Sequence, residues 1–265
     1  MLRRSIVTLS LLAMVACCSQ VNGENFRMET DVFVGNQKKP ICQTLTLFTD
    51  TMVYDFIYGP ADDEKHKEDQ QVTEVTVFDM SSSRVILLDM IKSRKTVLTQ
   101  QQLIEMTTAM KVHAAEKNDV YGFAADPKFE SKFVEEKLQL TLSSPNLIYD
   151  VKGSKPQRAP AAWRYQEFAD WSARLNACRP GNLPPFARIE LGKQLAERGL
   201  IPEEITRTTI APGRLGSKRL ELSSRHHVNW IISTKDRKRI ASVAEQIGKF
   251  EGVTFLSFIE AEKLK

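Results

Sequence analysis

The chain has 265 residues, 42% of them hydrophobic, and its Lys and Arg residues outnumber its Asp and Glu residues by four. Residues 1–23 contain two arginines and no acid, so the rest of the chain has a formal charge of +2. This imbalance is too small to indicate a nucleic acid or an anionic membrane as the main partner. The length and composition allow a substantial buried core.

The first 23 residues have the three parts of a cleavable secretion signal. Two arginines lie near the start, residues 5–18 form an apolar run too short to span a bilayer, and small residues follow. We therefore expect a signal peptide over residues 1–23, cleaved between Gly23 and Glu24. The mature chain would then be exported to the periplasm or the exterior, and no later stretch predicts a transmembrane segment.

The cysteines leave two alternatives open. Met14–Cys17 loosely resembles a bacterial lipobox, so a second interpretation has Cys17 lipidated and the protein tethered to a membrane. In the mature chain only Cys42 and Cys178 remain, and an oxidising compartment would allow one disulfide between them. The alternative is two buried free thiols. The chain has no Asn-x-Ser/Thr sequon, which favours a bacterial periplasm or exterior over a glycosylated eukaryotic surface.

From Phe26 onward the pattern predicts strands joined by tight turns. Apolar and charged residues alternate from Phe26 to Val34, which is typical of a strand with one buried face. The connections that follow are short, so neighbouring strands should be antiparallel. The strands predicted in this part of the chain cover residues 26–34, 41–48, 52–58, 72–78, 84–90 and 95–98.

The next elements alternate between helices and strands. In chain order they are a helix from Thr99 to about Glu116 with Gln102 at the capping-box position, strands over 128–134, 137–143 and 146–151, helices over 161–178 and 184–199, strands over 205–210 and 219–233, and a helix capped by Ser233. Val253–Ile259 predicts either a closing strand or a short helix. The whole pattern predicts an α+β fold: a curved, mostly antiparallel sheet, which could form an open half-barrel, with about four helices. Residues 24–265 would form one domain, with the polar stretch 153–160 as its best internal boundary.

Motifs for several common chemistries are missing from the sequence. There is no GxGxxG, GxxxxGK[ST] or GxSxG motif, so nothing predicts nucleotide binding or a serine nucleophile at an elbow. His226 and His227 are adjacent on a predicted strand, so they would point to opposite faces and could not easily share a metal ion. We expect no metal and no cofactor. One catalytic alternative stays open, a periplasmic hydrolase in which His226 or His227 acts with a carboxylate.

Two groups of large apolar side chains are candidate binding surfaces. The strand over 52–58 has large side chains on both faces, as expected either in a sheet buried on both sides or beside an apolar cavity. The candidate cavity wall consists of Met52, Tyr54, Phe56 and Tyr58. The helix over 161–178 carries a second set, a candidate docking face for another envelope protein, which consists of Trp163, Tyr165, Phe168 and Trp171.

Two resemblances extend this interpretation. The stretch FADWSARLNACRPGNLPPFARIELGKQLAERGLIPEEI, over residues 168–205, resembles a segment of an uncharacterised family of secreted bacterial proteins, which implies export and a shared fold but no activity. The order of elements, an antiparallel meander, a helix from Thr99 and further strands, is similar to that of the periplasmic lipoprotein carriers. That likeness implies an open half-barrel whose apolar cavity, plugged by helices, holds acyl chains.

The leading hypothesis is an exported, non-catalytic protein. Its curved sheet would bind an apolar or lipid-like ligand, or a partner in the cell envelope. The two alternatives are the hydrolase and a protein–protein interaction module that uses the aromatic residues of the helix over 161–178.

Overall fold

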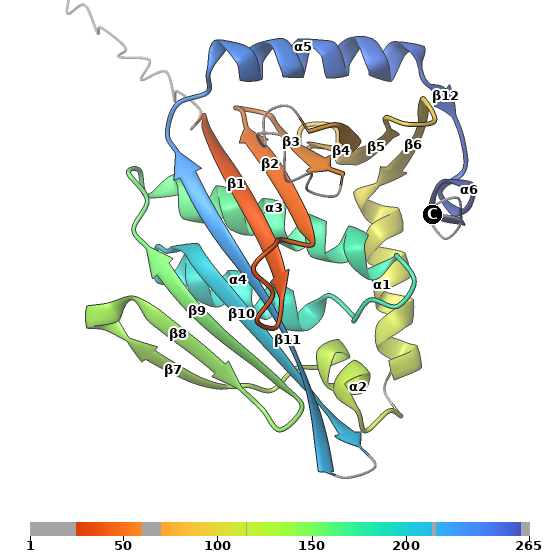
Figure 1. The fold of residues 1–265 in the computed structure, drawn as a ribbon. Helices are drawn as coiled ribbons and strands as arrows, with labels where there is room; N and C mark the ends of the chain where they lie inside the picture. Colours follow the sequence, from red (N-terminus) through yellow and green to blue (C-terminus); the bar gives the residue numbers. More distant parts are fainter. Residues whose placement is uncertain (1–24, 60–69, 115, 214–215, 261–265) are drawn as a thin grey trace, which may run out of the picture.

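The computed structural model describes residues 25–59, 70–114, 116–213 and 216–260. The expected signal peptide, its cleavage site between Gly23 and Glu24, and Cys17 lie outside the described residues. Within these ranges, twelve strands form one sheet in the order β12-β6-β5-β4-β3-β2-β1-β11-β10-β9-β8-β7 (Figure 1). Neighbouring strands are antiparallel except β12 and β6, which are parallel.

The first six strands form a meander, and β1 then pairs with β11, so the start of the described chain lies in the middle of the sheet. The strands are β1 (Phe26–Val34), β2 (Cys42–Phe48), β3 (Met52–Tyr58), β4 (Val72–Asp79), β5 (Arg84–Asp89), β6 (Arg94–Thr99), β7 (Glu130–Val134), β8 (Gln139–Ser143), β9 (Leu147–Ser154), β10 (Ile201–Gly213), β11 (Gly216–Asn229) and β12 (Glu251–Gly252). The helices are α1 (Gln100–Ala114), α2 (Val120–Ala125), α3 (Pro160–Ala177), α4 (Phe186–Glu197), α5 (Thr234–Lys249) and α6 (Phe255–Glu260), with a 3-10 turn at Glu135–Lys137.

The predicted α+β class and mostly antiparallel sheet are confirmed. The described residues form six α-helices instead of about four, because α2 and α6 add one short helix each. Helix α2 has only six residues and begins where the Asp119 carboxylate accepts the backbone N–H groups of Tyr121 and Gly122. Such a short helix leaves no periodic pattern in the sequence. The capping box at Thr99 is confirmed: its hydroxyl accepts the Gln102 N–H at 3.1 Å, and the Gln102 side chain accepts the Thr99 N–H at 2.8 Å.

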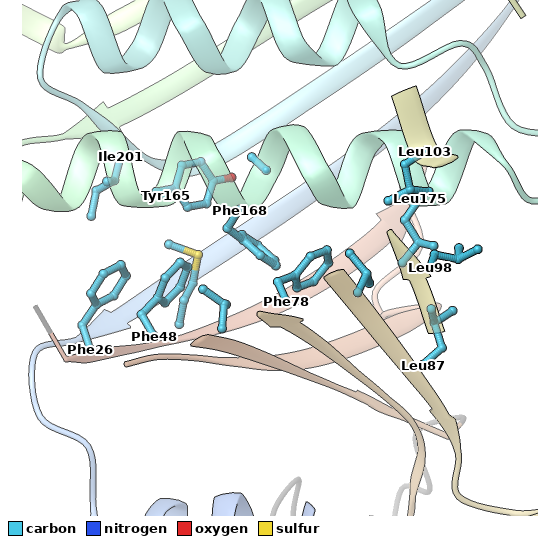
Figure 2. Packing of buried hydrophobic residues seen from close by; sticks show 14 of the residues in the cluster. Phe26, Phe48, Phe78, Leu87, Leu98, Leu103, Tyr165, Phe168, Leu175 and Ile201 are labelled. Atoms are coloured by element: carbon cyan, nitrogen blue, oxygen red, sulfur yellow. The ribbon is translucent and has the colours of Figure 1, made fainter. Parts of the chain in front are cut away.

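The meander β1–β6 is buried on both faces. On one face, aromatic side chains of the sheet pack under α3 (Figure 2): Phe26 stacks on Phe48 at 4.0 Å between ring centroids, and Phe168 meets Phe48 and Phe78 edge-on. On the opposite face, a second apolar layer from β2–β5 packs against Val243 of α5. In the other half of the sheet, a third cluster joins β8–β10 to α2 and α4.

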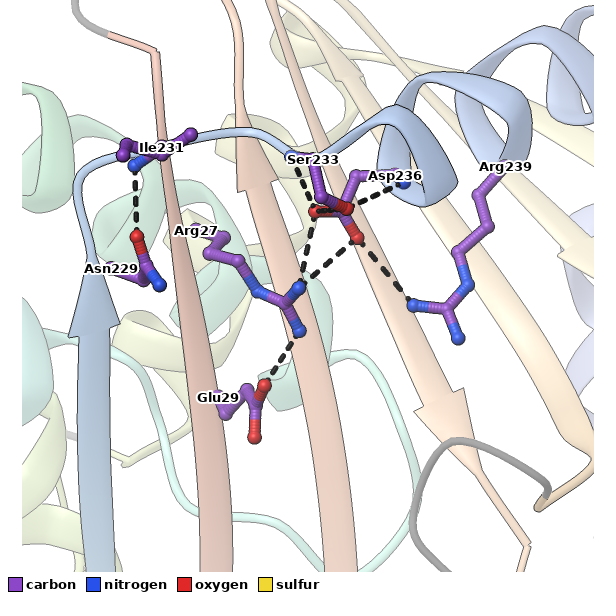
Figure 3. Close-up of polar contacts among 7 residues, drawn as sticks. All are labelled: Arg27, Glu29, Asn229, Ile231, Ser233, Asp236 and Arg239. Atoms are coloured by element: carbon purple, nitrogen blue, oxygen red, sulfur yellow. Dashed lines mark hydrogen bonds and ion pairs between the residues drawn. The ribbon is translucent and has the colours of Figure 1, made fainter.

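A buried ionic network fixes the start of α5 to β1 (Figure 3). Asp236 is 0% exposed, and its carboxylate accepts the Ser233 N–H and hydroxyl at 3.0 and 2.7 Å. The Ser233 hydroxyl in turn accepts the Asp236 N–H, which completes a capping box. Arg27 of β1 donates to the same carboxylate at 3.1 Å and to Glu29 at 2.6 Å, and Arg239 lies 3.6 Å from Asp236. The network therefore supplies both a helix cap and a tether to the sheet.

This network predicts a large loss of stability in Asp236→Ala. The substitution removes the cap of α5 and leaves the mostly buried Arg27 without its deepest counter-ion. We expect the free energy of unfolding, measured by urea denaturation, to fall by about 3 kcal/mol. The control is Glu245→Ala on the same helix, which removes only an exposed ion pair with Lys249 and should cost less than about 0.5 kcal/mol. Equal losses in the two variants would contradict a structural role for the network.

Candidate functional site

A cavity of about 590 Å³ lies between the sheet and the helices α3 and α4. Strands β1–β4 and β9–β11 line one side, and α3, α4 and the loop between them line the other. This volume falls within the range of about 300–1,000 Å³ typical of small-molecule sites. The cavity is therefore the candidate functional site.

The sheet side of the cavity has an apolar first cross-strand row, a mixed second row, a mainly polar third row, and Arg207 in the fifth row. Rows on the same face lie two residues, or about 6.6 Å, apart along the strands. The first row is apolar and closes one end: Phe26, Phe48, Val53, Phe78, Val85 and Leu98. The second is mixed: Met28, Thr46, Asp55 and Thr76. The third is mainly polar: His226, Thr30, Thr44, Ile57 and Glu74. The fourth contains Cys42, Val32, Ser224 and Ile205, and the fifth brings Arg207 beside Leu222 and Tyr149.

Two carboxylates lie on the side of the cavity formed by β3 and β4. Asp55 accepts a hydrogen bond from the Thr46 hydroxyl at 2.7 Å. Burial is the main cause that raises the pKa of Asp55 to about 6; the Thr46 hydrogen bond opposes the shift and the Glu74 charge adds to it. Glu74 forms an ion pair with Arg179, which follows the end of α3.

Two arginines lie on the side formed by α4 and β10. Pro184 and Pro185 precede α4, where proline is tolerated because the first helical N–H groups have no partner within the helix. This places Arg188 in the first turn, where its guanidinium donates to the Tyr165 hydroxyl of α3 at 2.9 Å. Arg207 lies directly across from Tyr149 in the pairing of β10 with β9. Burial raises the pKa of Tyr149, and the charges of Arg207 and Arg188 both oppose that shift, so both guanidinium groups lie close to this phenol.

His226 lies in the cavity as a neutral imidazole. Its Nδ1 is 3.1 Å from the Thr30 hydroxyl and its Nε2 is 2.9 Å from the Ser224 hydroxyl. Burial and, to a smaller extent, the positive charge of Arg188 lower the pKa of His226 to about 3. A neutral imidazole has one donor and one acceptor nitrogen, which suits two hydroxyl partners. His227 is exposed, so the prediction that the two histidines point to opposite faces is confirmed.

The candidate cavity wall inferred from the sequence lies on the wrong face of β3. Met52, Tyr54, Phe56 and Tyr58 do share one face, but they pack in the cluster beneath α5. The residues of β3 that line the cavity are the alternate ones, Asp55 and Ile57. The large side chains on both faces of this strand therefore come from burial on both sides of the sheet. Asp55 was the available signal, because a carboxylate in such a strand needs a polar environment.

The four aromatic residues proposed as a docking face do not form one surface. Trp163 is 54% exposed, but Tyr165 is only 3% exposed and Phe168 also points toward the sheet (Figure 2). Both of these inward residues line the cavity. Trp171 is partly buried against the same core. Their spacing on α3 therefore places two of the four at the site, and only Trp163 is exposed.

Cys42 and Cys178 are both free, partly buried thiols, so the disulfide that the sequence allowed is not formed in this structure. Cys42 lines the cavity, and Cys178 packs beside the core at the end of α3. Burial raises the pKa of Cys178 to about 11 and also raises that of Cys42. Both thiols are therefore protonated at neutral pH and are weak nucleophiles.

Comparisons with known proteins identify no relative that assigns a function. No family model matches the chain, and no curated protein matches it. Among solved structures, the chain is similar to a porin-like protein from Bacteroides uniformis, with 7% sequence identity, a TM-score of 0.26, and coverage of 78% of this chain and 98% of that chain. A likeness at this TM-score carries no argument about fold or function.

None of the helices in the described ranges is both long enough and apolar enough to cross a membrane. In the same part of the chain, His, Cys, Asp and Glu side chains form no group of three or more that could hold a metal ion.

The buried Asp55 carboxyl predicts a pH dependence of stability. Its pKa rises from 3.8 to about 6 on folding, so the folded state loses stability as the pH rises from about 4 to about 6. Asp55→Asn lacks that loss, because an amide does not titrate and still accepts the Thr46 hydrogen bond. The free energy of unfolding of the variant, relative to that of the unsubstituted protein, should therefore rise between about pH 4 and about pH 7.

Urea denaturation of both proteins across this pH range measures the effect. Asp170, whose pKa is raised to about 6 by burial, is present in both proteins and cancels in the comparison. His226 cancels as well, although it acts in the opposite direction: its lowered pKa removes stability as the pH falls from about 6.5 toward about 3. Parallel pH profiles for the two proteins would contradict the raised pKa of Asp55.

Proposed function

We propose that the protein is an exported, non-catalytic binding protein whose cavity holds a lipid-like ligand with one apolar end and one polar end. The observation that carries this proposal is the contrast between the apolar first row, with Phe26 and Phe48, and the polar and charged groups that line the rest of the cavity, such as Asp55, Glu74 and Arg207. Export is part of the proposal and rests on the secretion signal in the sequence.

The lining of the cavity favours an amphipathic occupant over a uniform one. Phe78, Phe168 and Met28 offer apolar surface at one end, and a purely polar ligand would leave that surface in contact with water. At the other end, a purely apolar ligand would remove water from charged groups such as Arg188 and Arg207 without replacing its hydrogen bonds. A molecule with an acyl or alkyl chain and a polar group avoids both costs.

The hydrolase alternative finds less support at this site. It requires a histidine within hydrogen-bonding distance of a carboxylate, as a general base or acid positioned by an acid. The side-chain partners of His226 within the described residues are instead the hydroxyls of Thr30 and Ser224. With a pKa of about 3, His226 is also a poor proton acceptor at neutral pH.

The interaction-module alternative is weakened by the orientation of α3. Tyr165 and Phe168 point into the cavity, which leaves Trp163 as the exposed member of the proposed docking set. Single exposed aromatic residues are common on protein surfaces and do not by themselves mark an interface.

A substitution that fills the cavity should abolish binding. Ala173 of α3 lines the cavity, so Ala173→Phe places a ring in the space that the ligand would occupy. We expect the neutral fluorophore N-phenylnaphthylamine to bind the unsubstituted protein with increased fluorescence and to bind the variant at least about tenfold more weakly.

The matched control is Ala244→Phe, which makes the same change on an exposed position of α5. This variant should bind the fluorophore as the unsubstituted protein does. Thermal unfolding of both variants checks that each is folded. If Ala173→Phe binds normally, or if the unsubstituted protein binds no fluorophore, the cavity is not a binding site for lipid-like molecules.

A further inference from the structure

Two arginines converge on the polar end of the cavity. Arg188 comes from α4 and Arg207 from β10, and the charges of both act on the phenol of Tyr149, whose pKa is raised first of all by its burial. Arg207 belongs to the fifth cross-strand row, which is the farthest from the apolar first row. The cavity therefore brings two positive charges to its lining away from the phenylalanines of the first row.

Each of these guanidinium groups has a buried N–H that is left unsatisfied. Within the described part of the chain, the Nη1 of Arg188 and the Nε of Arg207 have no hydrogen-bond partner. The hydrogen-bond partners of the two side chains are phenols instead of carboxylates, Tyr165 for Arg188 and Tyr149 for Arg207. A buried donor without a partner is costly, and the cost is greater when the group is charged.

The carboxylates around the cavity only partly offset these charges. Glu74 already forms an ion pair with Arg179, and Asp55 of β3 is separated from β11 by two strands and bonds to Thr46. Asp170 of α3 is also close enough to Arg188 for the positive charge to act on it, and that charge lowers the pKa of Asp170. Burial has the larger effect and raises the pKa of Asp170 to about 6, and its Oδ1 is also buried without a partner.

We infer that Arg188 and Arg207 together bind the anionic group of the ligand, so that the cavity selects single-chain anionic amphiphiles over neutral ones of equal chain length. This inference rests on the proposed function. The guanidinium fork of arginine matches both carboxylate and phosphate oxygens. The alkyl chain would then extend toward Met28, Phe78 and Phe168, while the Ser224 hydroxyl and the neutral His226 lie near enough to complete the polar end.

Isothermal titration calorimetry with four probes tests the inference. Decanoate and decyl phosphate share their chain length with neutral decanol, and inorganic phosphate has the anionic group without a chain. We expect the purified protein to bind decanoate or decyl phosphate at least about tenfold more tightly than decanol, and to bind inorganic phosphate weakly. The preference between decanoate and decyl phosphate distinguishes a fatty acid from a phosphate-bearing lipid.

Substitutions then assign the selectivity to the two arginines. In Arg188→Gln, Arg207→Gln and the double variant, the preference for the anion over decanol should fall toward one while the affinity for decanol is kept. The control is Arg219→Gln, which removes an exposed positive charge from β11 and should keep the full preference. Arg188→Lys and Arg207→Lys keep the charge but lose the fork, so they should keep part of the preference, and they serve if a Gln variant fails to fold.

The outcomes separate the inference from the proposed function. If no probe with a chain binds, the proposed function fails. If decanol binds as tightly as decanoate and decyl phosphate, or if the arginine variants keep the preference for the anion, the cavity binds lipid-like molecules but the inference is wrong. If inorganic phosphate binds as tightly as decyl phosphate, the arginines form an anion site that does not use the apolar end, which also overturns it.

Discussion

The structure depends on the alternation of side chains along strands that lie between two layers of helices. Strands β1–β6 present alternate residues to α3 and to α5, so each strand must satisfy two different environments at once. A shift of one residue in the register of β3 would place Asp55 beneath α5 and Phe56 in the cavity. The buried capping network at Asp236 and Arg27 ties α5 to β1 and so holds one of these layers in position. The shape and polarity of the cavity follow from that register.

The two faces of the sheet are packed differently, which explains why one sheet borders both a solid apolar core and a polar cavity. The face beneath α5 is filled by aliphatic and aromatic side chains, whereas the face beneath α3 is packed mainly along its first row, with Met28 and Leu87 of the second row added to that core. Beyond that row, α3 ends and the loop at residues 178–185 leads into α4, which leaves room lined by threonines, Asp55 and His226. Small hydroxyl side chains such as Thr30 and Thr44 leave space that larger residues would fill, and they supply hydrogen-bond partners for His226 and Asp55.

The sequence predicted the elements far better than the site. Alternation and capping signals located each of β1–β11 and the four longer helices, because these patterns are local. The same alternation showed that Met52, Tyr54, Phe56 and Tyr58 share a face, but it could not show which helix covers that face, since this depends on the distant α3 and α5. Arg188 and Arg207 are 19 positions apart in the sequence. They line the same cavity only because β9, β10 and β11 pair with one another and α4 packs over them. The sequence alone predicted that His226 and His227 point to opposite faces, because adjacent side chains on a strand always do so.

The central position of β1 constrains the order in which the chain can fold. One edge of β1 pairs with β2, close by in sequence, but its other edge pairs with β11, so that Arg27 lies opposite Asn229. The meander can form while most of the chain is still unstructured, yet β1 then offers an open edge until nearly the whole chain is present. Contacts so distant in sequence form slowly, because a long loop must close before they contribute any stability. A chain built in this way stays incompletely folded through most of its synthesis.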